Sequence, residues 1–169
     1  MKAFLGLTLA LAATALAAGA RSQEPALAGS PAACVEAMIA AGQPVAQCVN
    51  QSQAACLQHS QATALAATAC FLQARDEWAA LITDRLEAIG AVADDDVSGV
   101  AGIEVKYDLL ANFLQCDRLH ELSLLTEAEG VQLDWQKSRC QSTAAGLVFV
   151  KLVLQSHEIL AEPGGTPQQ

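Results

Sequence analysis

The chain has 169 residues, which fits a single domain, and its 18 acidic and 9 basic residues give a formal net charge of −9. An acidic surface repels nucleic acid and anionic lipid and attracts cationic partners, so we expect neither nucleic-acid binding nor membrane-surface binding. Only 4% of the residues are aromatic, and the abundant alanine favours helices but fills little core volume, which indicates a thin core that needs covalent cross-links.

Residues 1–20 have the three parts of a secretory signal peptide. Lys2 carries the positive charge, residues 3–18 are largely apolar, and the small residues Ala18, Gly19 and Ala20 form a cleavage site. A membrane anchor is the alternative, but a spanning helix needs about 20 consecutive apolar residues and this run is shorter. No later apolar run is long enough to span a bilayer; the most apolar one, over residues 146–154, is interrupted by Lys151 and is interpreted as a buried helix. We therefore expect a soluble product that is exported to the periplasm or secreted and that begins near Arg21. Because Lys2 is removed with the signal peptide, the mature chain is one charge more negative than the full chain.

All six cysteines follow this signal peptide, and an even number in an exported chain indicates three disulfides. They are Cys34, Cys48, Cys56, Cys70, Cys116 and Cys140. The first four form two local pairs of equal spacing, and each pair closes a loop of about 15 residues, worth ~3 kcal/mol in the chain-entropy model. We therefore expect pairs 34–48 and 56–70, which leaves 116–140. A reactive free thiol is the alternative, and the equal spacing also leaves a degenerate internal repeat open.

The first half of the mature chain predicts a lead-in and three helices. Residues 21–31, with Pro25, Gly29 and Pro31, form a flexible lead-in, and short helices follow over 32–41 and 44–52. Residues 62–89 contain neither proline nor glycine, which predicts a long helix. Its expected apolar stripe consists of Leu65, Ala69, Leu72, Ala79, Ile82, Leu86 and Ile89.

Residues 91–102 are expected to form a loop after Gly90. The run Asp94, Asp95 and Asp96 in this loop suggests calcium, but the aspartates are not alternate and Val105 stands where a calcium loop has its twelfth-position glutamate. We therefore interpret the run as a solvated acidic loop, and a calcium site stays the alternative.

The second half predicts further helices. Residues 103–122 place five apolar residues at helical spacing: Leu109, Leu110, Phe113, Leu114 and Leu119. Thr126 and Glu129 form a capping box that opens a helix to about residue 144, and Gly146 separates it from a last helix over 147–161. Residues 163–169 are expected to fray. The predicted fold is an all-α, disulfide-stapled bundle over 32–162, with three longer helices and short N-terminal ones.

Two segments carry a motif pattern. Residues 54–89 contain Cys56, Cys70 and the run from Glu77 to Thr83, and residues 126–143 contain Gln132, Trp135 and Arg139 in a Gln-x-x-Trp-x-x-x-Arg arrangement. These segments, about a third of the chain, resemble the N-terminal domain family of LprI-like lysozyme inhibitors, which are exported bacterial proteins. The family has Asp, Asn and Tyr where this chain has Ala79, Thr83 and Leu86. It also has two later cysteines where this chain has Thr143 and Phe149.

The resemblance implies a periplasmic binding protein that inhibits a lysozyme by protein–protein contact, without cofactor or metal. The negative charge of the chain suits a strongly basic partner of this kind, because opposite charges accelerate association. The alternative is a structural or stress-related module of the cell envelope with no enzyme target. A third hypothesis is metal binding through the histidines or through Asp94, Asp95 and Asp96.

The remaining candidate residues favour structural roles, and we expect no enzymatic activity and no catalytic residues. Trp135 and Arg139 share a helix face, either as a contact patch or, as we favour, as an anchor for the bundle with Arg139 stacked on Trp135 or paired with Asp117. Trp78 is expected in the core. Isolated histidines predict surface or capping roles; they are His59, His120 and His157. The carboxylates Asp76, Glu77, Asp84 and Glu87 are interpreted as a solvated helix face rather than a glycosidase pair.

Overall fold

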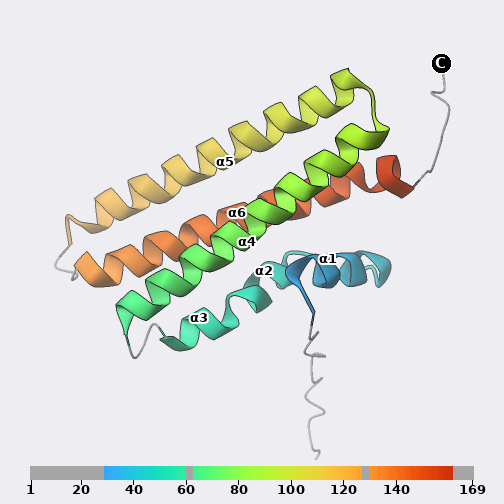
Figure 1. The fold of residues 1–169 in the computed structure, drawn as a ribbon. Coiled ribbons are helices and arrows are strands. Elements are labelled where there is room, and N and C mark those ends of the chain that lie inside the picture. The colour runs from blue at the N-terminus through green and yellow to red at the C-terminus, as the bar shows by residue number, and fades with distance from the viewer. Residues whose placement is uncertain (1–28, 60–62, 127–129, 162–169) are drawn as a thin grey trace, which may run out of the picture.

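The computed structural model describes residues 29–59, 63–126 and 130–161, and all regular secondary structure in these ranges is α-helical (Figure 1). The helices are α1 (Pro31–Ala40), α2 (Gln47–Ser52), α3 (Ala54–His59), α4 (Ala64–Val92), α5 (Asp95–Ser123) and α6 (Gly130–Ala161). The predicted fold class, an all-α disulfide-stapled bundle of three longer helices with short N-terminal ones, is confirmed. The predicted signal peptide, the tail over 163–169 and Glu129 of the predicted capping box lie outside the described residues.

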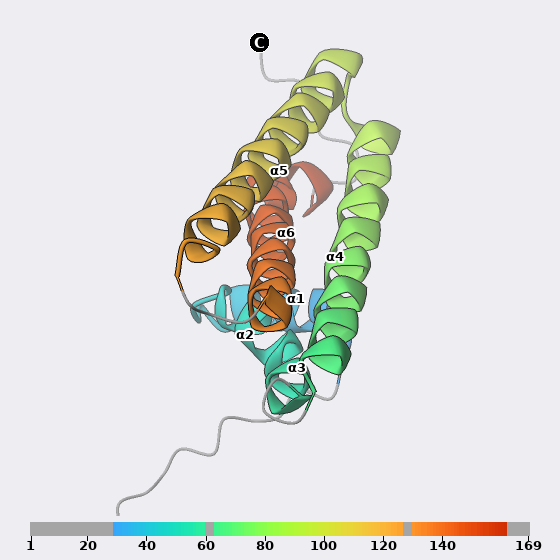
Figure 2. The ribbon, with the colours of Figure 1, turned by 90° about the vertical axis from the view of Figure 1, so that its left-hand side faces the viewer.

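The long helices form the body of the molecule, with α6 between α4 and α5 (Figure 2). Helix α6 packs most extensively on α4 and next on α5, while α4 and α5 touch little. The short helices α1, α2 and α3 run along one side of the α4–α6 pair (Figure 1). The core therefore lies around α6, which packs on α4, α5 and α2, whereas α1 packs mainly on α2 and α3 mainly on α4.

The main core lies between α4, α6 and the short helices. Trp78 of α4 is 1% exposed, and its ring centroid lies 5.5 Å from that of Phe149 in α6. Val35 of α1 and Val49 of α2 are buried in the same cluster. Full burial of side chains of this size stabilises the fold by about 1.5–3 kcal/mol each. The prediction that Trp78 belongs to the core is confirmed.

Two polar side chains make hydrogen bonds between helices. Gln53, 2% exposed at the junction of α2 and α3, donates from Nε2 to Ser142 Oγ at 3.3 Å and to Thr143 Oγ1 at 3.0 Å, both on α6. Arg85 of α4 donates from Nε to Ser156 Oγ of α6 at 2.8 Å. Because a buried polar group without a partner costs about 1–3 kcal/mol, these contacts fix the register between the helices.

Three disulfides link neighbouring helices, and they are the pairs expected from the sequence. Cys34–Cys48 joins α1 to α2, Cys56–Cys70 joins α3 to α4, and Cys116–Cys140 joins α5 to α6. Their Cα–Cα distances are 5.8, 5.4 and 5.7 Å. No free cysteine remains among the described residues, so the alternative of a reactive thiol is not supported there.

The break predicted at Gly146 is wrong, because α6 continues through it to Ala161. A Cβ atom at this position would lie 2.9 Å from Val49 Cγ1 and 3.0 Å from Trp78 Cε2, closer than such contacts normally come. The glycine therefore serves close packing of α2 and the Trp78 ring against α6. It does not mark the end of a helix.

The loop predicted over 91–102 is also wrong, because only Ala93 and Asp94 separate α4 from α5. The aspartate run belongs to the start of α5. Asp94 is the N-cap, with its Oδ1 accepting from Val97 N at 2.8 Å, and Asp95 and Asp96 lie in the first turn. Carboxylates at this end satisfy free backbone N–H groups and oppose the positive end of the helix dipole. The run is a helix start rather than a loop.

The apolar faces expected for two helices need correction. In α4 the buried face consists of Ala67, Phe71, Ala74, Trp78, Ile82 and Ile89. Leu65, Ala69 and Ala79 of the expected stripe are exposed. In α5, Leu109 and Phe113 are half-buried, whereas Leu110, Leu114 and Leu119 are exposed. Each segment carries apolar residues on two faces, so spacing alone did not identify the side that packs.

Helix α6 is apolar and long. Its span Gln132–Ala161 is long and apolar enough to cross a membrane, by length and composition, with a mean hydropathy of 1.4 in its most apolar window. Half of that window is buried inside the bundle. The expectation that no later segment can span a bilayer is thus not met on these criteria. A core helix of a soluble protein has the same properties, and in this fold α6 occupies the centre.

Candidate functional site

The outer side of α4 is a row of carboxylates, and we name Asp76, Glu77, Asp84 and Glu87 the acidic face. All four are exposed, and they recur at the helical period on the side opposite Trp78 and Ile82. The small Ala80 lies between them, so the carboxylates project from a flat surface. The prediction of a solvated helix face is confirmed for the position of these residues.

Few basic groups compensate the acidic face. Arg75 Nη2 lies 2.7 Å from Asp76 Oδ1, and Gln73 Nε2 donates to Glu77 Oε1 at 3.1 Å. Within the described ranges, neither Asp84 nor Glu87 has an ion-pair partner. An external cation therefore meets carboxylates that are held on a rigid helix and are still available for pairing.

The family-motif residues Gln132, Trp135 and Arg139 lie together near the start of α6. Trp135 is half-buried, stacks on Phe71 with ring centroids 6.1 Å apart, and donates from Nε1 to Gln132 Oε1. It closes a small second core that contains Cys56 and Phe71. Trp135 therefore packs within the bundle, as the structural interpretation expects, whereas Arg139 is exposed and neither stacks on Trp135 nor pairs with Asp117. Asp117 Oδ1 instead lies 2.9 Å from Lys137 Nζ.

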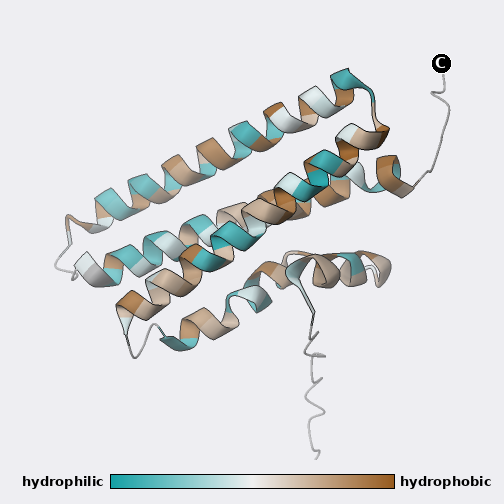
Figure 3. Cartoon of the chain, viewed as in Figure 1, coloured by the Kyte–Doolittle hydropathy of each residue, from teal (hydrophilic) through white to brown (hydrophobic). Residues whose placement is uncertain are grey.

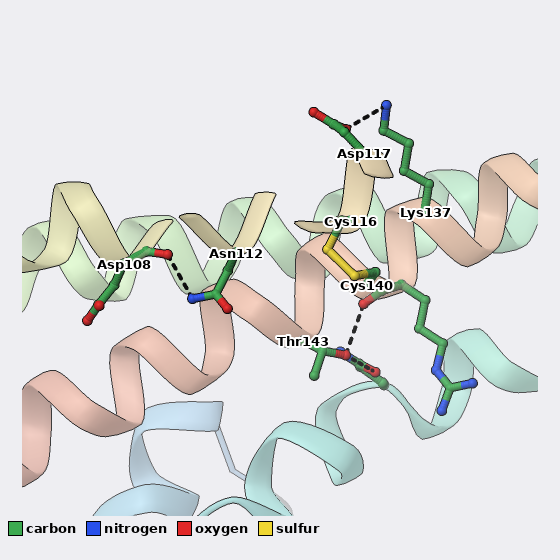
Figure 4. Close-up of a disulfide and its surroundings, with 9 residues drawn as sticks. Asp108, Asn112, Cys116, Asp117, Lys137, Cys140 and Thr143 are labelled. Carbon is green, nitrogen blue, oxygen red and sulfur yellow. Dashed lines mark hydrogen bonds and ion pairs between the residues drawn. A yellow bond between two sulfur atoms is a disulfide. The ribbon is translucent and has the colours of Figure 1, made fainter. Parts of the chain in front are cut away.

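An open groove of about 540 Å³ runs between α5 and α6 beside the Cys116–Cys140 disulfide. Trp135, Arg139 and Leu147 line it from α6, and Asn112 and Gln115 line it from α5. Figure 4 shows how the disulfide holds the two helices at this point, with the Lys137–Asp117 ion pair on one side and Thr143 on the other. A broad groove of this kind suits contact with a protein surface better than enclosure of a small molecule.

A smaller cavity of about 280 Å³ lies on the other side of the same disulfide. His120 lines it, with Nε2 at 3.9 Å from Asp134 Oδ1 and with a buried Nδ1 that has no hydrogen-bond partner within the described part of the chain. Leu119, Ser123 and Leu133 also contribute.

The histidines do not converge. His59 ends α3, His120 lies near the end of α5, and His157 is exposed near the end of α6. Across the residues that the structure describes, no group of three or more His, Cys, Asp or Glu side chains is placed to hold a metal ion. The metal-binding hypothesis through the histidines or Asp94, Asp95 and Asp96 thus gains no geometric support.

The outer side of α5 carries an apolar row that the sequence reasoning missed. It consists of Val100, Ile103, Tyr107, Leu110 and Leu114, and we name it the α5 stripe. These five side chains are 50–65% exposed, and they recur at alternating spacings of three and four residues. Figure 3 shows apolar residues recurring along α5 between polar ones. The spacing itself was a signal in the sequence, but the predicted apolar set grouped Leu110 and Leu114 with Leu109 and Phe113.

Polar contacts hold α5 to α6 on the opposite side. Lys151 Nζ lies 2.6 Å from Asp108 Oδ2 and 3.9 Å from Glu104 Oε2, and Gln155 donates to Glu104 Oε2 at 3.1 Å. The hydrogen bond to Asp108, followed by the charges of Asp108 and Glu104, raises the pKa of Lys151 above its usual value of 10.5, although some desolvation opposes this. Helix α5 buries only Val105 and Cys116 fully, so these contacts and the disulfide do much to hold it.

The exposed features are thus an acidic face on α4, an open groove at the α5–α6 junction and an apolar stripe on α5. All three are formed by the long helices. Comparison of the chain with protein-family models, with curated proteins and with solved structures finds no match. These surfaces present exposed carboxylates on α4 and exposed apolar side chains on α5.

Proposed function

We propose that this chain is an exported binding protein that inhibits a lysozyme, or a similarly basic enzyme, through contact with the acidic face of α4. The observation that carries the proposal is the row of exposed carboxylates with little internal compensation, in a chain of net charge −9. The resemblance of residues 54–89 and 126–143 to LprI-like lysozyme inhibitors supplies the target class. Residues 54–89 include the whole acidic face.

We propose that the protein acts in the periplasm or in the extracellular space. Three disulfides indicate an oxidising compartment, because the cytosol keeps thiols reduced. The signal-peptide pattern over residues 1–20 supports export as the route to that compartment. A soluble inhibitor would there meet enzymes that attack the cell wall from outside.

The contact would act chiefly by accelerating association through electrostatic attraction and by covering part of the enzyme surface. Opposite charges raise association rates by one or more orders of magnitude at low ionic strength, and salt removes most of this gain. A rigid helix with carboxylates on one side presents them without a large entropic cost of ordering a loop. The bundle would block access of the polysaccharide to the enzyme rather than enter the enzyme's cleft deeply.

A turbidity assay with bacterial peptidoglycan tests the proposal. The purified, oxidised protein at micromolar concentration is expected to slow lysis by a basic lysozyme at low salt. The variant Asp84→Lys with Glu87→Lys is expected to lose most of the inhibition. The control Glu121→Lys with Glu158→Lys changes the net charge equally at exposed positions outside the acidic face, and it should retain inhibition.

Two results would count against the proposal. If the unmodified protein does not slow lysis at micromolar concentration, a lysozyme is not the target. If both double variants lose inhibition equally, net charge alone matters and the acidic face is not the contact surface.

A further inference from the structure

We infer that the protein self-associates as an antiparallel dimer in which the α5 stripes of two copies pack against each other. No described helix covers the stripe, although Val100 at its N-terminal end also lines a small cavity beside Ile159 of α6. Val100, Ile103, Tyr107, Leu110 and Leu114 follow one another at spacings of three, four, three and four residues. This alternation is the seam along which two α-helices pack side by side.

The exposed area is sufficient for such an interface. At 50–65% exposure, the five residues present about 500 Å² per protomer, so a symmetric pair buries on the order of 1,000 Å² in total. This is the lower limit of specific interfaces, and it predicts a dissociation constant in the micromolar range. An apolar patch of that size is also at the upper end of what monomeric proteins expose.

Charge complementarity identifies a second copy as the occupant. Asp96 and Arg118 continue the line of the stripe at its two ends, one helical turn beyond Val100 and Leu114 respectively. Both are exposed, and neither has an ion-pair partner among the described residues. Tyr107 lies midway between them in the sequence. A two-fold axis at Tyr107 therefore places Asp96 of each copy beside Arg118 of the other.

The same charges determine the direction of pairing. A parallel arrangement would bring together two copies of Asp94, Asp95 and Asp96 at one end and two copies of Arg118 at the other. The antiparallel arrangement replaces both repulsions with ion pairs. Only Glu104, Lys106 and Asp108 are charged between Val97 and Gln115, and Glu104 and Asp108 contact Lys151 of α6. The seam itself is uncharged, so two acidic molecules can approach along it.

Sedimentation velocity of the purified, oxidised protein between about 1 and 300 µM tests the inference. The expected result is a monomer–dimer equilibrium whose dimer fraction rises with concentration. The variant Leu110→Glu should weaken association at least 100-fold, because it places a carboxylate in the seam. The control Leu65→Glu alters a side chain that is 77% exposed on α4, and it should leave the equilibrium unchanged.

A charge exchange tests the direction. Asp96→Arg alone and Arg118→Asp alone should each weaken dimerisation about tenfold, because each creates like-charge contacts in the antiparallel pair. The double variant should return to the affinity of the unmodified protein. Circular dichroism confirms that each variant folds. The inference would be overturned if the protein stays monomeric at 300 µM or if Leu110→Glu does not weaken the dimer. The antiparallel arrangement would be overturned if the double variant dimerises as weakly as the single variants.

Discussion

At Gly146, helix α6 comes into close contact with both α2 and α4. In a helical pattern a glycine suggests a break, since it costs about 1 kcal/mol relative to alanine. Here it lies within α6, where the Trp78 ring and Val49 approach too closely for a Cβ atom. The information that explains it is the contact with α2 and α4, which no local sequence pattern contains.

The variant Gly146→Ala is expected to destabilise the protein by about 1–3 kcal/mol, because the added methyl group forces the buried Trp78 ring or Val49 to shift. The control is Gly102→Ala in α5, where nothing lies within 4 Å of the new Cβ. That variant should gain up to about 1 kcal/mol from helix propensity. Chemical denaturation of both proteins provides the comparison, and equal stabilisation of both would contradict the close-packing account.

The ion pair of Lys151 is expected to make the stability of the protein depend on pH. Its pKa is raised in the folded state by the hydrogen bond to Asp108. The contribution of Lys151 to stability is therefore fully present below the usual pKa of 10.5 and is lost as the pH rises through the higher folded-state pKa. The unfolding free energies of the unmodified protein and Lys151→Met should differ at pH 8 and converge above pH 10.5. A difference that does not shrink with rising pH would contradict this role.

Among the elements, α5 depends least on a hydrophobic core. It buries only Val105 and Cys116 fully, and it contacts α4 little. The Cys116–Cys140 disulfide closes a loop of about 25 residues, which is worth ~3.5 kcal/mol in the chain-entropy model. The staple compensates for the fact that much of the apolar surface of α5 faces outwards.

Replacement of both Cys116 and Cys140 by alanine is therefore expected to cost about 3 kcal/mol and to loosen α5 selectively. Hydrogen exchange should accelerate over 95–123, while the amides around Trp78 in α4 keep most of their protection. The matched control, alanine at Cys34 and Cys48, should accelerate exchange in α1 and α2 instead. Uniform acceleration across α4, α5 and α6 would show that the disulfide is not a local staple for α5.

Element types were predictable from the sequence, whereas several boundaries and packing faces were not. The absence of proline and glycine over 62–89 was enough to predict α4, and cysteine spacing was enough to predict the pairs. The start of α5 was missed because three consecutive aspartates favour a loop and a helix N-terminus alike. The α5 stripe was missed because apolar residues lie on two sides of that helix, and tertiary contacts decide which side packs.

For the whole molecule, the acidic charge and the disulfides are the properties on which the proposed function depends. Charge distribution was readable from the sequence, because the carboxylates of α4 recur at the helical period. Their availability was not readable, since only the structure shows that Arg75 pairs with Asp76 and that Asp84 and Glu87 have no ion-pair partner among the described residues. The groove beside Trp135 and Arg139 likewise required the tertiary arrangement of α5 and α6.

Calorimetric titration of a basic lysozyme into the protein tests the proposed binding through exposed carboxylates. At about 20 mM salt we predict saturable binding at micromolar concentration, which weakens at least tenfold at about 200 mM salt because charge pairing at an exposed face is screened. Absence of binding heat with 50 µM protein at both of two temperatures, or an affinity that salt leaves unchanged, would contradict the account.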